Sequence, residues 1–139
     1  MSPDLERRLV ETYPKLFSGY GAPPDKLPMA FGFECDDGWF DLLDSLCAQL
    51  TMLKSGAEDS EPLPLTALQV KEKYGTVRFY LGACTAEALI LVDFAEAMSA
   101  KICEACGTGA AHVEQRGSRH SAMPVHVSRA TQIPRVEGL

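Results

Sequence analysis

A chain of 139 residues with 46% apolar and 23% charged residues has the composition of a single globular domain, which excludes a wholly disordered chain. The net charge of −6 argues against a general nucleic-acid-binding protein, because phosphate neutralisation needs clustered Lys and Arg. No secretory signal pattern and no apolar run of membrane-spanning length is present, so we expect a cytoplasmic protein. Its five cysteines then indicate reduced thiols or metal ligands rather than a disulfide framework.

The first expected element is a helix from Pro3 to about Phe17. Ser2 has the position of an N-cap, and proline suits the first helical turn. Its apolar face consists of Leu5, Leu9, Tyr13 and Leu16. The stretch that follows is rich in glycine and proline and is expected to be irregular.

A second helix is expected from Asp36 or Asp37 to about Lys54, with Gly56 ending it. Its wide apolar stripe comprises Trp39, Leu42, Leu43, Leu46, Cys47, Leu50 and Leu53. Trp39 should be largely buried. The acidic, proline-containing residues 55–65 are expected to form a surface loop.

The segment Gln69–Leu81 has the pattern of a β-hairpin, with Gly75 marking the reversal. Apolar residues alternate with polar ones on both sides of that glycine, at Leu68, Val70, Val77, Phe79 and Leu81. An isolated hairpin is marginally stable, so the amphipathic helices on either side are expected to cover its apolar face.

Thr85 is expected to cap a third helix from Ala86 to about Lys101. In this helix Leu89, Ile90, Phe94, Ala97 and Met98 fall on one side. The predicted class is therefore α+β: two N-terminal helices, a hairpin, a third helix packed on it, then a cysteine knuckle and an irregular tail. We expect one domain over residues 1–107 and an irregular, mobile tail over 108–139.

The sharpest chemical signal is the segment Cys103-Glu-Ala-Cys106-Gly107. Two cysteines two residues apart, followed by glycine, are typical of a knuckle that holds a tetrahedral zinc ion. A redox dithiol is a weaker interpretation, because such pairs open a helix rather than follow one. A pair of unliganded thiols remains as an alternative.

His120 and His126 complete the metal site by spacing, as in a zinc finger. Pro124 lies between them and would break the helix with which a finger presents its histidines, which argues against this completion. His112 is a third candidate, and a solvated loop histidine is its better interpretation.

Four further segments form a recognisable set: Phe31-Gly-Phe-Glu-Cys-Asp-Asp-Gly-Trp39, Gln69-Val-Lys-Glu-Lys-Tyr-Gly75, Arg78-Phe-Tyr80 and Ile102-Cys-Glu-Ala-Cys-Gly107. Together they resemble a family of small uncharacterised phage and prophage proteins. The resemblance covers roughly residues 28–107 and implies no activity. It implies a second cysteine pair that completes a zinc ribbon, which this chain lacks after Gly107.

Back-translation of the sequence suggests how the second cysteine pair was lost from the tail. Codons compatible with residues 116–126, read two nucleotides later, permit Trp, Val, a small residue, Thr, Leu, Cys, Asp, Ala, Cys and Ala. We hypothesise that the tail arose by a frameshift. A nucleotide sequence whose codons forbid this alternative frame would refute the hypothesis.

Lys71, Lys73, Arg78 and Tyr80 are expected on the outward face of the hairpin, as a basic and aromatic patch in an acidic protein. A solvated strand face is the simple interpretation, and a contact for an acidic partner is the functional one. Glu34, Asp36 and Asp37 gather around Cys35. They are interpreted as helix-capping acids rather than a metal or acid–base site.

The sequence contains no phosphate loop, nucleophile elbow or dinucleotide fingerprint. We therefore expect a non-enzymatic protein-binding role without a small-molecule substrate. The resemblance to phage proteins implies its most concrete version, a protein that binds a host or defence protein complex and interferes with it, for example as an anti-CRISPR type of inhibitor. The alternative is a zinc-ribbon-like nucleic-acid-binding module that uses the basic hairpin face. A metal- or thiol-dependent enzyme is the third possibility.

Overall fold

The computed structural model describes residues 1–53 and 65–109, and the backbone of two short strands at 112–114 and 123–125. The helices in these parts of the chain are α1 (Pro3–Thr12), α2 (Phe40–Met52) and α3 (Ala86–Ser99). The main sheet contains β1 (Phe33–Glu34), β2 (Ala67–Lys73) and β3 (Thr76–Leu81). The predicted α+β class is confirmed. The division into residues 1–107 and 108–139 stays a prediction.

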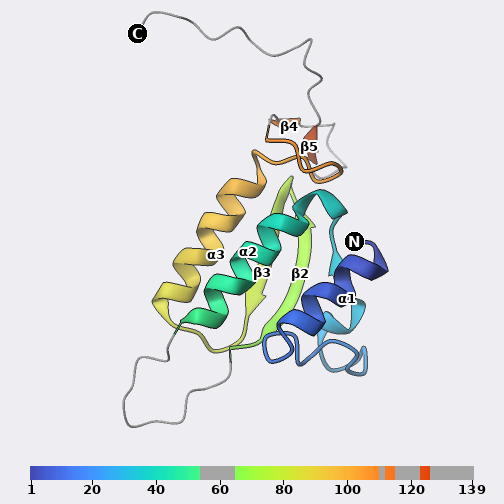
Figure 1. Ribbon diagram of the computed structural model, residues 1–139, viewed down its shortest axis with the longest axis vertical. Coiled ribbons are helices and arrows are strands. Elements are labelled where there is room, and N and C mark those ends of the chain that lie inside the picture. The colour runs from blue at the N-terminus through green and yellow to red at the C-terminus, as the bar shows by residue number, and fades with distance from the viewer. Residues whose placement is uncertain (54–64, 110–111, 115–122, 126–139) are drawn as a thin grey trace, which may run out of the picture.

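The strands of the main sheet lie in the order β1-β2-β3. The antiparallel pair β2–β3 is the predicted hairpin, with Val70 opposite Phe79. β1 pairs with β2 in parallel, and it was not predicted because two residues are too few to show an alternation. α2 and α3 run side by side, with α3 along the β3 edge of the hairpin, and α1 lies toward the opposite edge of the sheet, near β1 (Figure 1).

The core lies between the sheet and the helices. Trp39, Leu43 and Val70 are fully buried, so the predicted burial of Trp39 is confirmed. The Phe17 ring contacts Phe33 edge-on, with 5.0 Å between the ring centroids, and lies 6.2 Å from Phe79. The side chains of three strands and of the segment after α1 therefore meet in one apolar cluster.

α1 ends at Thr12 rather than near Phe17. The cause is Pro14, because the residue before a proline is forced out of the helical region. Tyr13 accordingly has φ −124° and ψ 59°. Leu16 and Phe17 are still buried, but they reach the core from the turn that follows the helix.

α2 is preceded by a short 3-10 helix, η2 (Asp37–Trp39), so helical structure begins where the sequence predicts it. Its buried residues Leu43, Leu46, Cys47 and Leu50 all belong to the predicted stripe. Lys54, Gly56 and the loop predicted for residues 55–65 lie outside the described residues, except for Leu65 at the end of that loop.

The hairpin contains an irregularity that changes its first strand. The register shifts between Ala67 and Gln69, which makes Leu68 the extra residue of a bulge. Ala67 is therefore buried and Leu68 only half-buried. Of the other inward positions, Val70, Val77 and Phe79 are buried as predicted, and Leu81 at the end of β3 is half-buried.

α3 begins as predicted, with the Thr85 hydroxyl accepting the backbone N–H of Ala88 at 3.4 Å. Its packing on the hairpin is also confirmed. However, the apolar side named from the sequence is not the side that packs, since Leu89, Ile90, Phe94 and Ala97 are exposed and Met98 is half-buried. The buried residues of α3 are Ala88, Val92, Ala95 and Ser99.

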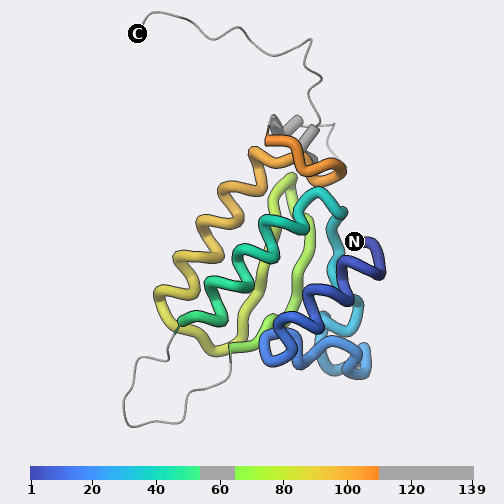
Figure 2. The backbone as a smooth tube through the Cα atoms, in the orientation of Figure 1, coloured from blue at the N-terminus to red at the C-terminus, as the bar shows by residue number. Residues whose placement is uncertain are grey.

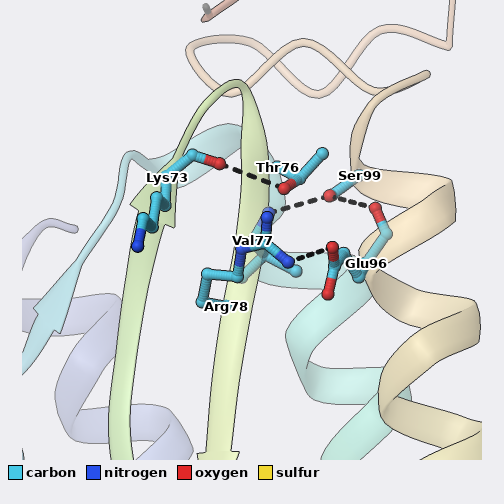
Figure 3. A network of polar contacts seen from close by, with 6 residues as sticks. All are labelled: Lys73, Thr76, Val77, Arg78, Glu96 and Ser99. Atoms are coloured by element: carbon cyan, nitrogen blue, oxygen red, sulfur yellow. Dashed lines mark hydrogen bonds and ion pairs between the residues drawn. The ribbon is translucent and has the colours of Figure 1, made fainter. Parts of the chain in front are cut away.

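The small residues of α3 bring it close to β3, which is an edge strand (Figure 3). The fully buried hydroxyl of Ser99 accepts the backbone N–H of Val77 at 2.8 Å and donates to the Glu96 carbonyl at 2.6 Å. The Arg78 guanidinium donates to the Glu96 carboxylate nearby. A large side chain at position 99 would hold the helix too far away for this hydrogen bond.

The tail contains two short strands, β4 (His112–Glu114) and β5 (Met123–Val125), which pair antiparallel. The sequence pattern does not predict them. The strand at Pro124 agrees with the argument that this proline interrupts any helix between His120 and His126. Among the helices described, even α3, the longest with 14 residues, falls short of the about 20 apolar residues that a bilayer crossing requires.

Candidate functional site

Lys71, Lys73, Arg78 and Tyr80 share one face of the hairpin, which we call the cationic face. Lys71 lies directly opposite Arg78 in the ladder, and residues two apart on a strand point to the same side. The core residues Val70, Val77 and Phe79 occupy the opposite side. The geometry thus brings the four predicted residues together, and their role in binding stays a prediction.

Acidic residues lie beside the two central residues of the cationic face, Lys71 and Arg78, and partly neutralise their positive charge. Arg78 forms an ion pair with Glu96 of α3, and both side chains are about 30% exposed. Lys71 is half-buried and pairs in register with Glu34 of β1. The more accessible members of the cationic face are Lys73 and Tyr80, which lie at its two ends and are both exposed.

The hairpin tip adds an aromatic residue that the sequence reasoning did not name. Tyr74 has φ 54° and Gly75 has φ 81°, so both central residues of the two-residue turn are left-handed, as in a type I′ turn. Glycine adopts this conformation freely, whereas a bulky residue there is a backbone outlier. The Tyr74 side chain is 64% exposed and makes no core contact in return.

Each of the two exposed tyrosines of the hairpin, Tyr74 and Tyr80, lies beside a lysine. The Lys73 ammonium is 5.4 Å from the centre of the Tyr74 ring, and the Lys71 ammonium is 5.9 Å from that of Tyr80. Such cation–π contacts at exposed positions contribute about 0.5–1 kcal/mol and hold the cation over the ring. The tip and the cationic face together present two ordered lysine–tyrosine pairs.

The cysteine knuckle follows α3 and forms a tight turn. The backbone N–H of Gly107 donates to the Cys103 carbonyl at 2.8 Å, and Gly107 has φ 77°, which favours glycine. Cys103 is buried and Cys106 is exposed. The two thiols therefore differ in their access to solvent.

The knuckle is the docking site of the turn that begins α2 (Figure 2). Three hydrogen bonds join the segments: Gly38 N–H to the Glu104 carbonyl, Asp36 N–H to the Glu104 carboxylate, and the Trp39 indole N–H to the Ile102 carbonyl. A Cβ atom at position 38 would lie 2.2 Å from the Cys103 carbonyl oxygen, so only glycine fits. The segment that begins α2 and the knuckle, which are far apart in the sequence, are thus in direct contact.

Glu104 is a buried carboxylate at the centre of this contact, with 4% of its surface exposed. One oxygen accepts the Asp36 N–H at 3.0 Å, and the other has no hydrogen-bond partner among the described residues. Burial raises the pKa of the Glu104 carboxyl above its usual range. Its observed role is to join the knuckle to the start of α2.

The acids around Cys35 do not form a separate site. Asp36 has the N-cap position of η2 but its side chain makes no capping hydrogen bond, and Asp37 accepts the backbone N–H of Ser2 at 2.6 Å. Glu34 accepts a hydrogen bond from the Gln69 side chain. Burial raises the pKa of the Cys35 thiol to about 12, so this thiol is protonated at neutral pH and is a poor nucleophile.

For the implied zinc, residues 1–53 and 65–109 supply the two knuckle thiols and no group of three or more His, Cys, Asp or Glu side chains able to hold a metal ion. A closed structural zinc site needs four ligands. The other predicted ligands, His120 and His126, lie outside the described residues, as does the side chain of His112 in β4. The described part of the chain therefore offers at most the two knuckle cysteines toward the four ligands of such a site.

Comparison with known proteins adds no assignment: no family model matches the chain, and neither does any curated protein or solved structure. The function is accordingly inferred from the residues and their geometry.

Proposed function

We propose that this protein is a non-enzymatic accessory protein of the phage type. It binds a host or defence protein complex in the host cytoplasm and interferes with it, for example as an anti-CRISPR type of inhibitor. The binding surface in this proposal is the hairpin tip with the cationic face. The phage origin and the class of target come from the family resemblance, and the binding surface comes from the hairpin geometry.

The observation that carries the proposal is the conformation of Tyr74. A non-glycine residue in such a sparsely populated region costs about 1–3 kcal/mol, and this one leaves its ring in solvent. The cation–π contact with Lys73 offsets at most part of this cost, and Asn at the same position would form the turn with less strain. Tyrosine is among the residues that dominate binding at protein interfaces.

The chemistry of the surface favours an acidic protein partner. Lys71 and Lys73 carry positive charge beside exposed rings, in a protein whose net charge is −6. A basic partner would be attracted to the rest of the molecule and not to this face. The position of the two lysine–tyrosine pairs therefore directs an acidic surface to the hairpin tip.

A second candidate is the zinc-ribbon-like nucleic-acid-binding module, because aromatic rings beside lysines also suit stacked bases and phosphates. The two candidates differ in their response to salt. Binding to nucleic acid weakens steeply, as phosphate contacts release counterions, while a protein interface with an aromatic centre weakens less. Measuring the affinity of the purified partner at several salt concentrations separates them.

The test uses Tyr74→Asn, which creates the Asn-Gly pair preferred by type I′ turns. The variant should be about 1 kcal/mol more stable than the wild type, because the strain at position 74 is reduced. It should also capture much less partner from host lysate, as quantified by mass spectrometry. Gain of stability together with loss of binding is the expected signature.

The matched control is Phe31→Asn, since Phe31 is an aromatic residue of nearly equal exposure, 65%, in a segment that packs beside β2 but away from the hairpin tip. This variant should capture the partner normally. Undiminished capture by Tyr74→Asn would refute the proposed surface, and equal loss in both variants would show that capture depends on general surface hydrophobicity.

A further inference from the structure

α3 turns its largest apolar side chains toward solvent. Ile90 is 67% exposed and Phe94 is 65% exposed, although both lie in the middle of a well-packed helix. Isolated apolar residues are normal on a protein surface, whereas a contiguous apolar strip marks a site of contact. The arrangement of these residues along the helix shows which contact they fit.

Five exposed residues follow the spacing of a helix-pairing interface: Glu87, Ile90, Phe94, Ala97 and Lys101. The intervals are three, four, three and four residues, the repeat that keeps one stripe of a helix facing a partner helix. The stripe lies on the side of α3 opposite the buried residues Ala88, Val92, Ala95 and Ser99. We call these five residues the α3 seam.

The charges of the α3 seam are complementary to those of a second, antiparallel copy of the same seam. Phe94 is its central residue, seven positions from the carboxylate of Glu87 and seven from the ammonium of Lys101, which lies in the turn that ends α3. A two-fold axis passing near Phe94 would bring each Glu87 toward Lys101 of the other copy. A parallel arrangement would instead place like charges together at both ends.

We propose that two copies of the protein associate through the α3 seam, with the two α3 helices antiparallel. The contact would be isologous, as in most homodimers, with Ile90 and Phe94 buried at its centre and an ion pair at each end. The small side chain of Ala97 permits close approach of the helices. This proposal does not rest on the proposed function, because the seam contains no residue of the hairpin tip or the cationic face.

The charge pattern favours a second copy over an unrelated partner. Contact with an unrelated protein would require only the apolar centre of the seam. The opposite charges of Glu87 and Lys101, at equal distances from Phe94, would each pair with the opposite charge of a second copy that runs antiparallel. An interface made by one pair of helices is small, so we expect a weak dimer that dissociates within the range of protein concentrations used for sedimentation. Dimerisation therefore has to be measured over a range of concentrations.

The test is sedimentation equilibrium of the full chain from about 1 μM to about 1 mM, a range that covers weak interfaces. The wild type should shift with concentration from the 15.1 kDa monomer to the dimer. Phe94→Asp should weaken dimerisation by about 30-fold or more, as expected for loss of a central aromatic residue. Leu89→Asp is the matched control, because Leu89 is also exposed on α3 but lies off the seam, and it should dimerise as the wild type does.

Charge reversal tests the antiparallel arrangement. Glu87→Lys alone and Lys101→Glu alone should each weaken the dimer by about threefold or more at low salt, and the double variant should recover wild-type affinity. Far-UV circular dichroism confirms that each variant is folded.

A wild type that remains monomeric at about 1 mM would overturn the proposal. So would a dimer that survives Phe94→Asp, or a double charge reversal that fails to recover. If the wild type is monomeric and Phe94→Asp loses capture of another protein, the seam belongs to that partner and the homodimer is wrong.

Discussion

α2 and α3 lie side by side against the same hairpin, yet they use their apolar residues in opposite ways. α2 buries large side chains such as Leu43 and Leu50 and, apart from Met52 at its end, exposes polar ones. α3 buries small side chains such as Ala88 and Ala95 and exposes Ile90 and Phe94. The difference shows that a helix held close to an edge strand has room only for small residues, so its large residues are available for contacts outside the fold.

The largest expected difference in stability is between alanine variants of two phenylalanines, Phe79 and Phe94. Phe79→Ala should destabilise the protein by roughly 3–5 kcal/mol, because Phe79 is 5% exposed and packs near Phe17. Phe94→Ala should change stability by less than about 0.5 kcal/mol in the monomer, because its ring is mostly in solvent. Urea denaturation at low protein concentration measures both, and similar losses in the two variants would contradict the assignment of α3 faces.

The next largest expected loss of stability comes from removing the hydrogen bond between α3 and β3. Ser99→Ala should cost about 1–3 kcal/mol, because the buried N–H of Val77 would lose its hydrogen-bond acceptor. Ser45→Ala is the control, since Ser45 is exposed on α2, and it should change stability by less than about 0.5 kcal/mol. If thermal unfolding shows no difference between the two variants, the hydroxyl does not connect α3 to the sheet edge.

The smallest effect concerns α2, which is tied to the end of α1 by Tyr13. The Tyr13 hydroxyl donates to the Asp44 carboxylate at 2.8 Å, and Tyr13→Phe should cost about 0.5–1.5 kcal/mol at neutral pH. Burial and this carboxylate raise the pKa of Tyr13 from 10.0 to about 12. The folded protein therefore holds the phenol proton more tightly than the unfolded chain does, and this stabilisation is lost as pH rises through that interval.

Denaturation at neutral and at alkaline pH checks this expectation. The cost of Tyr13→Phe should shrink as pH approaches about 12. A cost for Tyr13→Phe that does not change with pH would contradict the coupling to Asp44.

The hairpin was predictable because its signals are local. Alternating residues and Gly75 lie within one short segment, and the start of α3 was equally visible from Thr85. The buried side of α3 was not predictable from its pattern, because residues 88–92 are all apolar and periodicity cannot select one side of such a run. The positions of β3 and α2 in the folded chain decide which side of α3 is covered.

In the candidate site, too, some features could be predicted from local sequence patterns and others depend on the folded chain. The four residues of the cationic face could be grouped from strand alternation, but the pairing of Arg78 with Glu96 depends on where α3 lies. Gly75 indicated a turn, and Tyr74 in an adjacent Tyr-Gly pair was the available signal for a type I′ turn. The contact of Gly38 with the knuckle required the folded chain, because no pattern in one segment names its distant partner.

The docking of the knuckle on the start of α2 also has a consequence for the order of folding. It joins residues 63 and 68 positions apart, Trp39 with Ile102 and Asp36 with Glu104, whereas the hairpin closes over a two-residue turn. Long loops lose more entropy on closing, so we expect the hairpin to form early and the docking to form late. Because Trp39 is the single tryptophan, its stopped-flow fluorescence should report the late step. A fluorescence change as fast as the first gain of strand signal in circular dichroism would contradict this order.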